Sequence, residues 1–447
     1  LEWLDKMKYY STRDKNNIVS FRTAVMDGLA KDGGLFMPEA VIPLPSSMIS
    51  NIDKYSFQEI SYEIAKNFVG EEISHKELLT IIESAINFQA PLVELSDQLS
   101  VLELFHGPTL AFKDFGARFM AKTMEYFAKD LDKELNILVA TSGDTGSAVA
   151  YGFYGVEGIN VYLLYPSGKV SYIQEKQLTT LDKNITAIEI DGTFDDCQRL
   201  VKDAFVDSDL NEKLYLSSAN SINIARLIPQ SFYYVNAYSQ VKDKTKPVII
   251  SVPSGNLGNL TAGLFAKGMG VPITKFIGAT NSNGVFTEYL NTSQFNPRNS
   301  VQTLSNAMDV GNPSNLERII DLYNGDIGKI REEIYSTSYS DESTKEGIKE
   351  LFEKYNYVID PHGAVGYQAL KHYLGSHDFG SVNGIIVETA HPAKFKDVVE
   401  DSIQNEVQIP ERLAVCLTKK KKSIQMKKEY SNLKELLLKG TSKNCCF

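Results

Sequence analysis

The chain has 447 residues, of which 43% are hydrophobic and 23% are charged, a composition typical of a soluble globular protein. This length exceeds what one hydrophobic core usually supports, so we expect two or three packed subdomains with a cleft between them. The formal net charge of -10 argues against nucleic-acid binding as the main role. No apolar run approaches the roughly 18 residues that a membrane-spanning helix needs, so we expect no membrane anchor.

Four cysteines are present, and their spacing matches no common zinc or redox motif. This usage predicts a reducing, cytoplasmic setting and no metal site. The start of the sequence lacks the features of a signal peptide. We expect Met7 to be the native start, with residues 1–6 and the ending GTSKNCCF as additions to the native sequence.

In chain order, the first region is residues 7–95, where helical periods dominate and strand signals are few. From about residue 136, short β-branched runs alternate with helical periods, a rhythm typical of βαβ units and mostly parallel sheets. The expected strands are NILVA (136–140), VYLLY (161–165), ITAIEI (185–190), KPVIISV (246–252), TKFIGAT (274–280), YVID (357–360) and residues 383–389.

The charged segment 324–356 has a helical period and is interpreted as a solvated helical excursion. The lysine run 419–422 is interpreted as a solvated surface. We therefore divide the chain into an N-terminal helical region (1–95), a smaller α/β domain (96–240), a larger α/β domain (241–430) and a C-terminal tail (431–447).

The loop SVPSGNLGNLTAG, residues 251–263, follows an expected strand and begins a helix. Gly255 and Gly258, with Asn256 and Asn259, would present backbone N–H groups and a helix N-terminus to a dianionic phosphate. The spacing fits neither a P-loop nor a dinucleotide fingerprint. The alternative is an ordinary tight turn between strand and helix.

A second loop, TSGDTGSAVA at 141–150, also joins an expected strand to a helix. Its hydroxyls and glycine amides could bind a carboxylate; the groups are those of Thr141, Ser142, Gly143, Thr145 and Gly146. The alternative is that Asp144 or Ser142 caps the helix.

Lys113 lies in LELFHGPTLAFKDFGARFM, residues 102–120, between Phe112 and Phe115. An ammonium in such apolar surroundings is desolvated unless it reacts or finds a partner, which makes Lys113 a candidate for a Schiff base. The alternative is a surface lysine whose stem covers an apolar helix face.

The segment ETAHPAKF, residues 388–395, directly follows the last expected strand. Thr389 could form a hydrogen bond with a heteroaromatic ring nitrogen, and His391 and Lys394 could face the same cleft. The alternative is that Thr389 caps a helix.

These four segments, together with TLSNAMDVGNPSN at 303–315, resemble the motifs of the threonine synthase family of bacteria and fungi. The resemblance also includes YSTRD at 10–14, DGLAKDGGLFMPE at 27–39, LYPSGKVSYIQEKQL and SSANSINIARLIPQ, and it extends from Tyr9 to about Lys394. It implies a fold-type-II pyridoxal-phosphate enzyme, similar to tryptophan synthase β, with two open, mostly parallel sheets covered by helices.

The resemblance also implies roles for individual residues. Lys113 would form the Schiff base with pyridoxal 5'-phosphate, Thr389 would meet the pyridine nitrogen, and the TSGDTG loop, with Asp144 in it, would bind the substrate carboxylate. The cofactor phosphate would be bound by Gly255, Asn256, Leu257, Gly258 and Asn259. The phosphate of the substrate, O-phospho-L-homoserine, would be bound by Lys169, Asn220, Ser221, Asn223 and Arg226. For Arg226 a structural ion pair is the alternative.

The implied reaction converts O-phospho-L-homoserine and water to L-threonine and phosphate. One alternative keeps the cofactor but stops after elimination and releases a keto acid, as a dehydratase does. Another is a noncatalytic binding module of the same fold. We expect a monomer or small homo-oligomer with no nucleic-acid partner.

Overall fold

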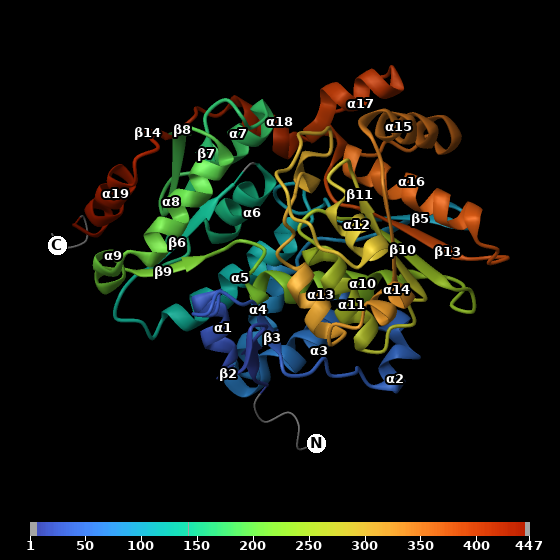
Figure 1. The fold of residues 1–447 in the computed structure, drawn as a ribbon, viewed down its shortest axis with the longest axis horizontal. Helices are drawn as coiled ribbons and strands as arrows, with labels where there is room; N and C mark the ends of the chain where they lie inside the picture. Colours follow the sequence, from blue (N-terminus) through green and yellow to red (C-terminus); the bar gives the residue numbers. More distant parts are fainter. Residues whose placement is uncertain (1–6, 142, 443–447) are drawn as a thin grey trace.

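Two sheets covered by helices form the frame of the molecule (Figure 1). The computed structural model describes residues 7–141 and 143–442, with side chains described as far as residue 439. Ser142, residues 1–6 and the side chains of the ending GTSKNCCF (440–447) therefore lie outside the described part. The two expected open α/β sheets are present. Within residues 7–141 and 143–442, no helix is long and apolar enough to cross a membrane.

The larger sheet has six strands, and its neighbours pair in parallel except at β4. In spatial order they are β12 (Ile334–Ser338), β11 (Lys275–Thr280), β10 (Val248–Pro253), β13 (Asn383–Glu388), β5 (Leu99–Glu103) and β4 (Leu92–Ser96). Every residue of β10 is buried, as expected for a β-branched run in the middle of a helix-covered sheet.

The smaller sheet has five strands, all paired in parallel. In spatial order they are β14 (Ile424–Lys427), β8 (Ile185–Asp191), β7 (Ile159–Pro166), β6 (Leu135–Ala140) and β9 (Tyr215–Ser218). Figure 1 shows this sheet to the left of the larger one, with the C-terminal helix at its outer side.

The helices and 3₁₀ turns after β5 cover both sheets, and the buried helices α5 and α10 pack against each other. The longer helices are α5 (Lys113–Ala128), α6 (Asp144–Phe153), α7 (Tyr172–Thr179), α8 (Phe194–Val206), α10 (Ile224–Gln240), α11 (Gly258–Gly268), α12 (Val285–Thr292), α15 (Asp341–Tyr355), α16 (Pro361–Ser376), α17 (Lys396–Ile403), α18 (Glu411–Thr418) and α19 (Tyr430–Ser442). The shorter ones are α9 (Ser208–Lys213), α13 (Leu316–Leu322), α14 (Ile327–Glu333), η3 (Asn306–Met308) and η4 (Pro392–Phe395).

The N-terminal region packs on the shared core below both sheets and is not purely helical. Its helices are α1 (Phe21–Asp27), α2 (Ser46–Ile49), α3 (Phe57–Val69) and α4 (His75–Ala85), with 3₁₀ turns η1 (Ile52–Lys54) and η2 (Gly70–Glu72). A small antiparallel sheet joins them, with strands β2 (Asp14–Val19), β1 (Tyr9–Ser11) and β3 (Phe36–Pro38). β1 and β3 have three residues each, and β2 has six residues of which none is buried, so they give no clear apolar period of two, and only helices were expected.

One expected strand is wrong, and several strands were missed: β4, β5, β9, β12, β14 and the three strands of the N-terminal region. Residues 357–360 form no strand, because Glu388 accepts a 2.8 Å hydrogen bond from the Asp360 amide and Pro361 follows, which has no N–H. The edge of the sheet is instead β12, inside the segment interpreted as helical. Its alternating burial over Ile334–Thr337 is the strand signal that the surrounding charged helices concealed.

Strand pairing crosses the domain division expected from the sequence. β5 lies within residues 96–240 but belongs to the larger sheet, and β14 lies within residues 241–430 but pairs with β8 of the smaller one. Each sheet is built from segments that are distant in the chain. The division into domains at residues 96, 241 and 431 therefore stays a proposal.

Candidate active site

Lys113 is the first residue of α5, and the end of β13 lies against the segment before it. The Phe112 amide donates a 2.9 Å hydrogen bond to the Thr389 carbonyl, and Ala111 forms a β-bridge with Ala390. These contacts bring Thr389 and Lys113, which are far apart in sequence, to one place. The Thr389 side chain is buried and its hydroxyl forms no hydrogen bond with another described residue.

The Lys113 amine is poorly solvated, and no described residue provides a counter-ion in direct contact with it. Its Nζ lies 5.5 Å from the centroid of the Phe112 ring and forms no hydrogen bond or ion pair with another described residue. Burial lowers the pKa of Lys113, Asp144 opposes that fall, and Lys394 and Arg226 add to it. A lysine with a lowered pKa has more neutral amine, the form that acts as a nucleophile and as a base.

Lys394 and Asp144 form a buried ion pair beside Lys113. Lys394 Nζ lies 2.6 Å from Asp144 Oδ1, and the side chains are 0% and 4% exposed. Burial by itself would raise the pKa of Asp144, but Lys394 and Lys113 outweigh it and hold that pKa well below its usual range. Asp144 therefore stays ionised, and it does not cap α6, which has no side-chain cap.

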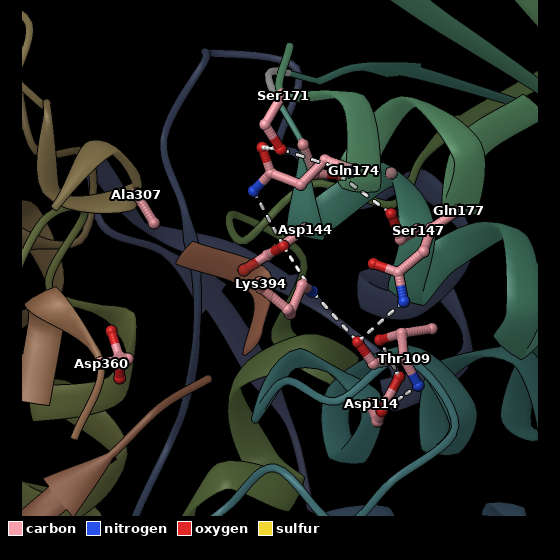
Figure 2. A network of polar contacts seen from close by, with 12 residues as sticks. Thr109, Asp114, Asp144, Ser147, Ser171, Gln174, Gln177, Ala307, Asp360 and Lys394 are labelled. Atoms are coloured by element: carbon pink, nitrogen blue, oxygen red, sulfur yellow. Dashed lines mark hydrogen bonds and ion pairs between the residues drawn. The ribbon is translucent and has the colours of Figure 1, made fainter. Parts of the chain in front are cut away.

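A network of amides and hydroxyls surrounds this ion pair (Figure 2). Gln174 of α7 donates a 3.0 Å bond to Asp144 Oδ1, and Lys394 donates a 3.0 Å bond to the Thr109 carbonyl. Gln177 donates to the same carbonyl at 3.2 Å. The Lys394 ammonium thus joins the loop before α5 to the first turn of α6.

The carboxylate loop predicted at 141–146 is held in shape by Thr141. Its hydroxyl accepts hydrogen bonds from the amides of Gly143 (3.1 Å) and Gly146 (2.9 Å). Gly143 has φ of +150°, and a Cβ there would lie 2.7 Å from the Gln174 side chain. The loop thus needs glycine at 143, and the first amides of α6 remain without intrahelical acceptors. Thr145 is half-buried.

The predicted phosphate loop has the backbone that an anion site needs. Leu257 adopts φ of +60° at the N-cap of α11, which turns successive amides toward one side. A Cβ on Gly255 would lie 2.8 Å from the Ala307 carbonyl oxygen, so glycine is required there. The Asn256 side chain donates to Ser221 Oγ at 2.7 Å and accepts from the Ser314 amide at 2.5 Å. Gly258 begins α11, whose first amides have no intrahelical acceptors.

The Asn259 side chain is held by two hydrogen bonds, and one of its polar atoms has no partner among the described residues. Its Oδ1 accepts hydrogen bonds from the hydroxyls of Tyr233 (2.5 Å) and Tyr234 (2.7 Å), while its buried Nδ2 has no partner in the part of the chain that the structure describes. The Tyr233 ring contacts Phe115 of α5, with centroids 5.3 Å apart. This chain of contacts links the phosphate loop to the helix that begins at Lys113.

The five residues expected at the substrate phosphate have different environments. Ser221 contacts the phosphate loop through Asn256, Asn220 is half-buried beside it, and Lys169 is exposed in the loop before α7. Asn223 caps α10: its side chain accepts from the Ala225 amide and donates to the Val25 carbonyl. For these residues a contact with substrate stays a prediction.

Arg226 is buried and forms no ion pair with a described carboxylate, so the structural pair considered as its alternative is absent from the described residues. It donates a 2.6 Å bond to the Ala219 carbonyl, and its Nε has no partner among them. Burial lowers its pKa to about 10.

Three contributors to the site were not assigned from the sequence. Lys394 was placed only near the cleft, and Gln174 and Tyr233 were not considered at all. Lys394 had a usable signal, since it follows a strand end in a motif with Thr389. Gln174 and Tyr233 lie on helices whose sequence period shows only that one face is buried.

These features fit pyridoxal phosphate. The phosphate loop offers amides without intrahelical acceptors. Within the part of the chain that the structure describes, Asn259 Nδ2, the Lys113 amine and the Thr389 hydroxyl have no partner, so they are available for a ligand. A family model described as "Pyridoxal-phosphate dependent enzyme" matches residues 87–387. The fold and the site define a fold-type-II enzyme whose cofactor is pyridoxal phosphate.

Two more specific models, "Threonine synthase N terminus" and "Threonine synthase, C-terminal", match residues 8–86 and 363–437. Threonine synthase of Serratia marcescens is 45% identical over 413 residues, covering 92% of this chain and 94% of that protein. The crystal structure of threonine synthase from Escherichia coli is 41% identical with a TM-score of 0.89 and covers 97% of this chain and 100% of that one.

A structure of "PLP bound" threonine synthase from Brucella melitensis is 33% identical with a TM-score of 0.91, covering 96% of this chain and 98% of that one. The chain belongs to the threonine synthase family. It is a pyridoxal-phosphate-dependent lyase of threonine biosynthesis, as the sequence motifs predicted.

Proposed function

We propose that this enzyme converts O-phospho-L-homoserine and water to L-threonine and phosphate, with Lys113 as the residue that binds the cofactor and moves protons. The observation that supports this assignment most strongly is the position of the Lys113 amine. Among the described residues it has no hydrogen-bond or ion-pair partner, and its pKa is lowered. Its helix contacts the phosphate loop through Tyr233, and the ionised Asp144 acts on its charge.

The residues that would hold the cofactor are grouped at two strand ends. The amides of Gly255, Asn256, Leu257, Gly258 and Asn259 and the Asn259 side chain would bind its phosphate, because dianions bind well at helix N-termini with turned amides. Thr389 would meet the ring nitrogen. A neutral hydroxyl does not force a proton onto that nitrogen, so the surrounding amides and cations must supply much of the charge stabilisation.

The substrate would lie between the two sheets. Its carboxylate would bind at the first turn of α6, where Gly143 and Thr145 contribute amides and Thr141 fixes the loop. Its phosphate would meet Lys169, Asn220 and Ser221, which lie on loops after β7 and β9, with the buried cation Arg226 behind them. Asn223, whose side chain caps α10, would lie with them at that phosphate.

Bound pyridoxal phosphate supplies an electron sink that stabilises negative charge at the substrate carbon next to the amine. Lys113 removes the proton from Cα of the substrate, and a Cβ proton follows, so that phosphate leaves from Cγ. Water then adds its oxygen at Cβ, and protons return to Cγ and Cα, which gives the methyl and hydroxyl groups of threonine. Lys394 holds Asp144 ionised beside Lys113, so that the amine can accept and return protons in a fixed field.

The test is to incubate the enzyme with O-phospho-L-homoserine and pyridoxal phosphate and to measure phosphate and threonine together. Equal amounts of the two products are expected, and the Lys113→Ala variant should release neither. A keto acid in place of threonine would identify the dehydratase alternative. No product of either kind, with cofactor bound, would favour the binding module.

We further propose that the enzyme works in the cytoplasm as a monomer or small homo-oligomer. The two cysteines within the described residues, Cys197 and Cys416, are both buried and unpaired, which suits a reducing compartment. Light scattering of the purified protein would measure its oligomeric state directly.

A further inference from the structure

Two carboxyl groups lie side by side in the core behind Thr389. Glu388 is the last residue of β13 and Asp360 is the N-cap of α16; both are 0% exposed. The Asp360 amide donates a 2.8 Å hydrogen bond to Glu388 Oε1. No ammonium or guanidinium within the described residues forms an ion pair with either carboxyl.

One oxygen of each carboxyl has no partner among the described residues. These atoms are Asp360 Oδ2 and Glu388 Oε2. Two ionised carboxylates in such a position would repel each other and leave buried charge unsatisfied, which is strongly unfavourable. A single proton shared by the two carboxyl groups removes the repulsion, as in other carboxyl pairs that share a site.

The contacts of Asp360 extend in a second direction, toward the phosphate loop. Asp360 Oδ1 accepts a 2.7 Å bond from the His362 amide and lies 2.5 Å from His362 Nδ1. His362 Nε2 accepts a 3.1 Å bond from the Ala307 amide. An acceptor at Nε2 places the ring proton of a neutral His362 on Nδ1, where it is donated to Asp360. Figure 2 labels Asp360 and Ala307 on the opposite side of Lys394 from Gln177.

The two ends of this chain touch the two ends of the cofactor site. Glu388 directly precedes Thr389. At the other end, the Ala307 carbonyl oxygen lies 2.8 Å from the position that a Cβ on Gly255 would take. We propose that Glu388 and Asp360 share one proton, and that the chain Glu388–Asp360–His362–Ala307 is a positioning device that fixes Thr389 and the phosphate loop relative to each other. The second part rests on the proposed binding roles of Thr389 and Gly255; the shared proton does not.

The groups around the pair favour its proton. Burial and Asp360 raise the pKa of Glu388 well above its usual range. Glu103 of β5, which accepts a 2.9 Å bond from the Tyr357 hydroxyl, adds negative charge nearby. Lys113 interacts weakly with the charge of Asp360, and burial lowers the pKa of the nearby His391 to about 4, so that His391 is neutral above that pH. Gly363 makes room for the pair, since a Cβ there would lie 1.8 Å from Glu388 Oε2.

The shared proton is tested on the apoenzyme, without cofactor or substrate. Glu388→Gln and Asp360→Asn each replace the proton by a permanent amide donor of the same shape. Because the folded wild type holds one more proton than the unfolded chain, its unfolding constant should rise about tenfold per pH unit relative to Glu388→Gln as pH increases above about 5. Parallel pH profiles for wild type and both variants would overturn the shared proton. If the pH profiles are parallel and sodium or potassium ions stabilise the wild type, a cation lies between the carboxyl groups instead of the proton, and the proposal is likewise wrong.

The positioning role is tested by cofactor affinity, measured from the visible absorbance of bound pyridoxal phosphate. Glu388→Gln should bind within about threefold of wild type, because the amide keeps the hydrogen bonds, whereas Glu388→Leu should bind at least about tenfold more weakly. If the folded Leu variant, checked by circular dichroism, binds as tightly as the Gln variant, the positioning role is wrong. Failure of the wild type to bind cofactor would instead contradict the proposed binding site, and the pH profiles would still decide the proton.

Discussion

Lys394 Nζ lies 2.6 Å from Asp144 Oδ1, and this contact joins the end of the six-stranded sheet to the first helix turn after a strand of the five-stranded sheet. Lys113 lies beside the pair and is influenced by both of its members. The ion pair therefore connects the two halves of the enzyme at the reacting amine, and it sets the field in which that amine gains and loses protons.

Removal of one partner of this pair should be costly. We expect Lys394→Met to lower the free energy of unfolding by about 3–5 kcal/mol, because it leaves the buried Asp144 charge uncompensated. The double variant Lys394→Met/Asp144→Asn should lose less than the sum of the single variants. Urea unfolding of the apoenzymes measures both. The exposed pair Lys345–Asp401, 2.7 Å apart, provides the control: Lys345→Met should leave stability nearly unchanged. Equal effects of the two lysine substitutions would contradict this account.

The phosphate loop should not tolerate a side chain at position 255. In Gly255→Ala the new Cβ would meet the Ala307 oxygen at 2.8 Å and the Met308 Cα at 2.9 Å, and backbone atoms cannot move aside as a flexible side chain can. We expect the affinity for pyridoxal phosphate to fall by about tenfold or more, which corresponds to a strain of 1.4 kcal/mol or more. Gly375→Ala, in α16 with nothing within 4 Å, is the matched control and should bind normally. Unchanged binding by both variants would show that the loop can adjust.

Asn259 should contribute through its unpaired Nδ2. The Asn259→Asp variant keeps an oxygen acceptor for the hydroxyls of Tyr233 and Tyr234 but replaces the donor by a negative charge facing the phosphate. Loss of a hydrogen bond to a charged group costs about 1.5–3 kcal/mol, so cofactor affinity should fall by roughly ten- to a hundredfold. Absorbance titration gives the affinity, and circular dichroism checks the fold. Wild-type affinity in a folded variant would mean that Asn259 does not face the phosphate.

The pH dependence of stability should include a contribution from Asp114, the residue after Lys113. Burial raises the pKa of Asp114 to about 6, although its two hydrogen bonds from Thr109 oppose that rise. A raised pKa means that the folded state holds its proton to higher pH, so this stabilisation is present below about pH 4 and is lost as pH rises to about 6. Relative to Asp114→Asn, wild type should lose on the order of 3 kcal/mol across that window. Urea unfolding between pH 4 and 7 tests this, and a constant difference would contradict it.

Between residues 136 and 280 the order of elements could largely be predicted, because β-branched runs and glycine loops are local signals. NILVA, KPVIISV and the strand ending at Glu388 are strands, and helices begin where the loops at 141 and 255 predicted them. The strand β12 was missed because it lies between two charged helices. Residues 357–360 were expected to form a strand because their apolar character is local, whereas the hydrogen bond from Asp360 to Glu388 depends on the tertiary fold.

The site was predictable to the level of its loops and not of its contacts. Lys113 and Thr389 occur in recognisable motifs, but their proximity follows from the Phe112–Thr389 hydrogen bond, which no sequence period indicates. Asp144 and Lys394 have opposite charges, but they are 250 residues apart in the sequence, and no local pattern indicated that they form an ion pair. The structure shows that the Asn223 side chain caps α10, which its residue type alone did not indicate, and its contact with the substrate phosphate stays a prediction.

The most direct test of the account is to identify the lysine that binds the cofactor. The enzyme loaded with pyridoxal phosphate would be reduced with borohydride, digested and analysed by mass spectrometry, which locates the cofactor-derived label on one peptide. Label on Lys113, lost in Lys113→Ala together with threonine formation, is the predicted result. Label on Lys394 or any other lysine in the wild-type enzyme would contradict the assignment of Lys113.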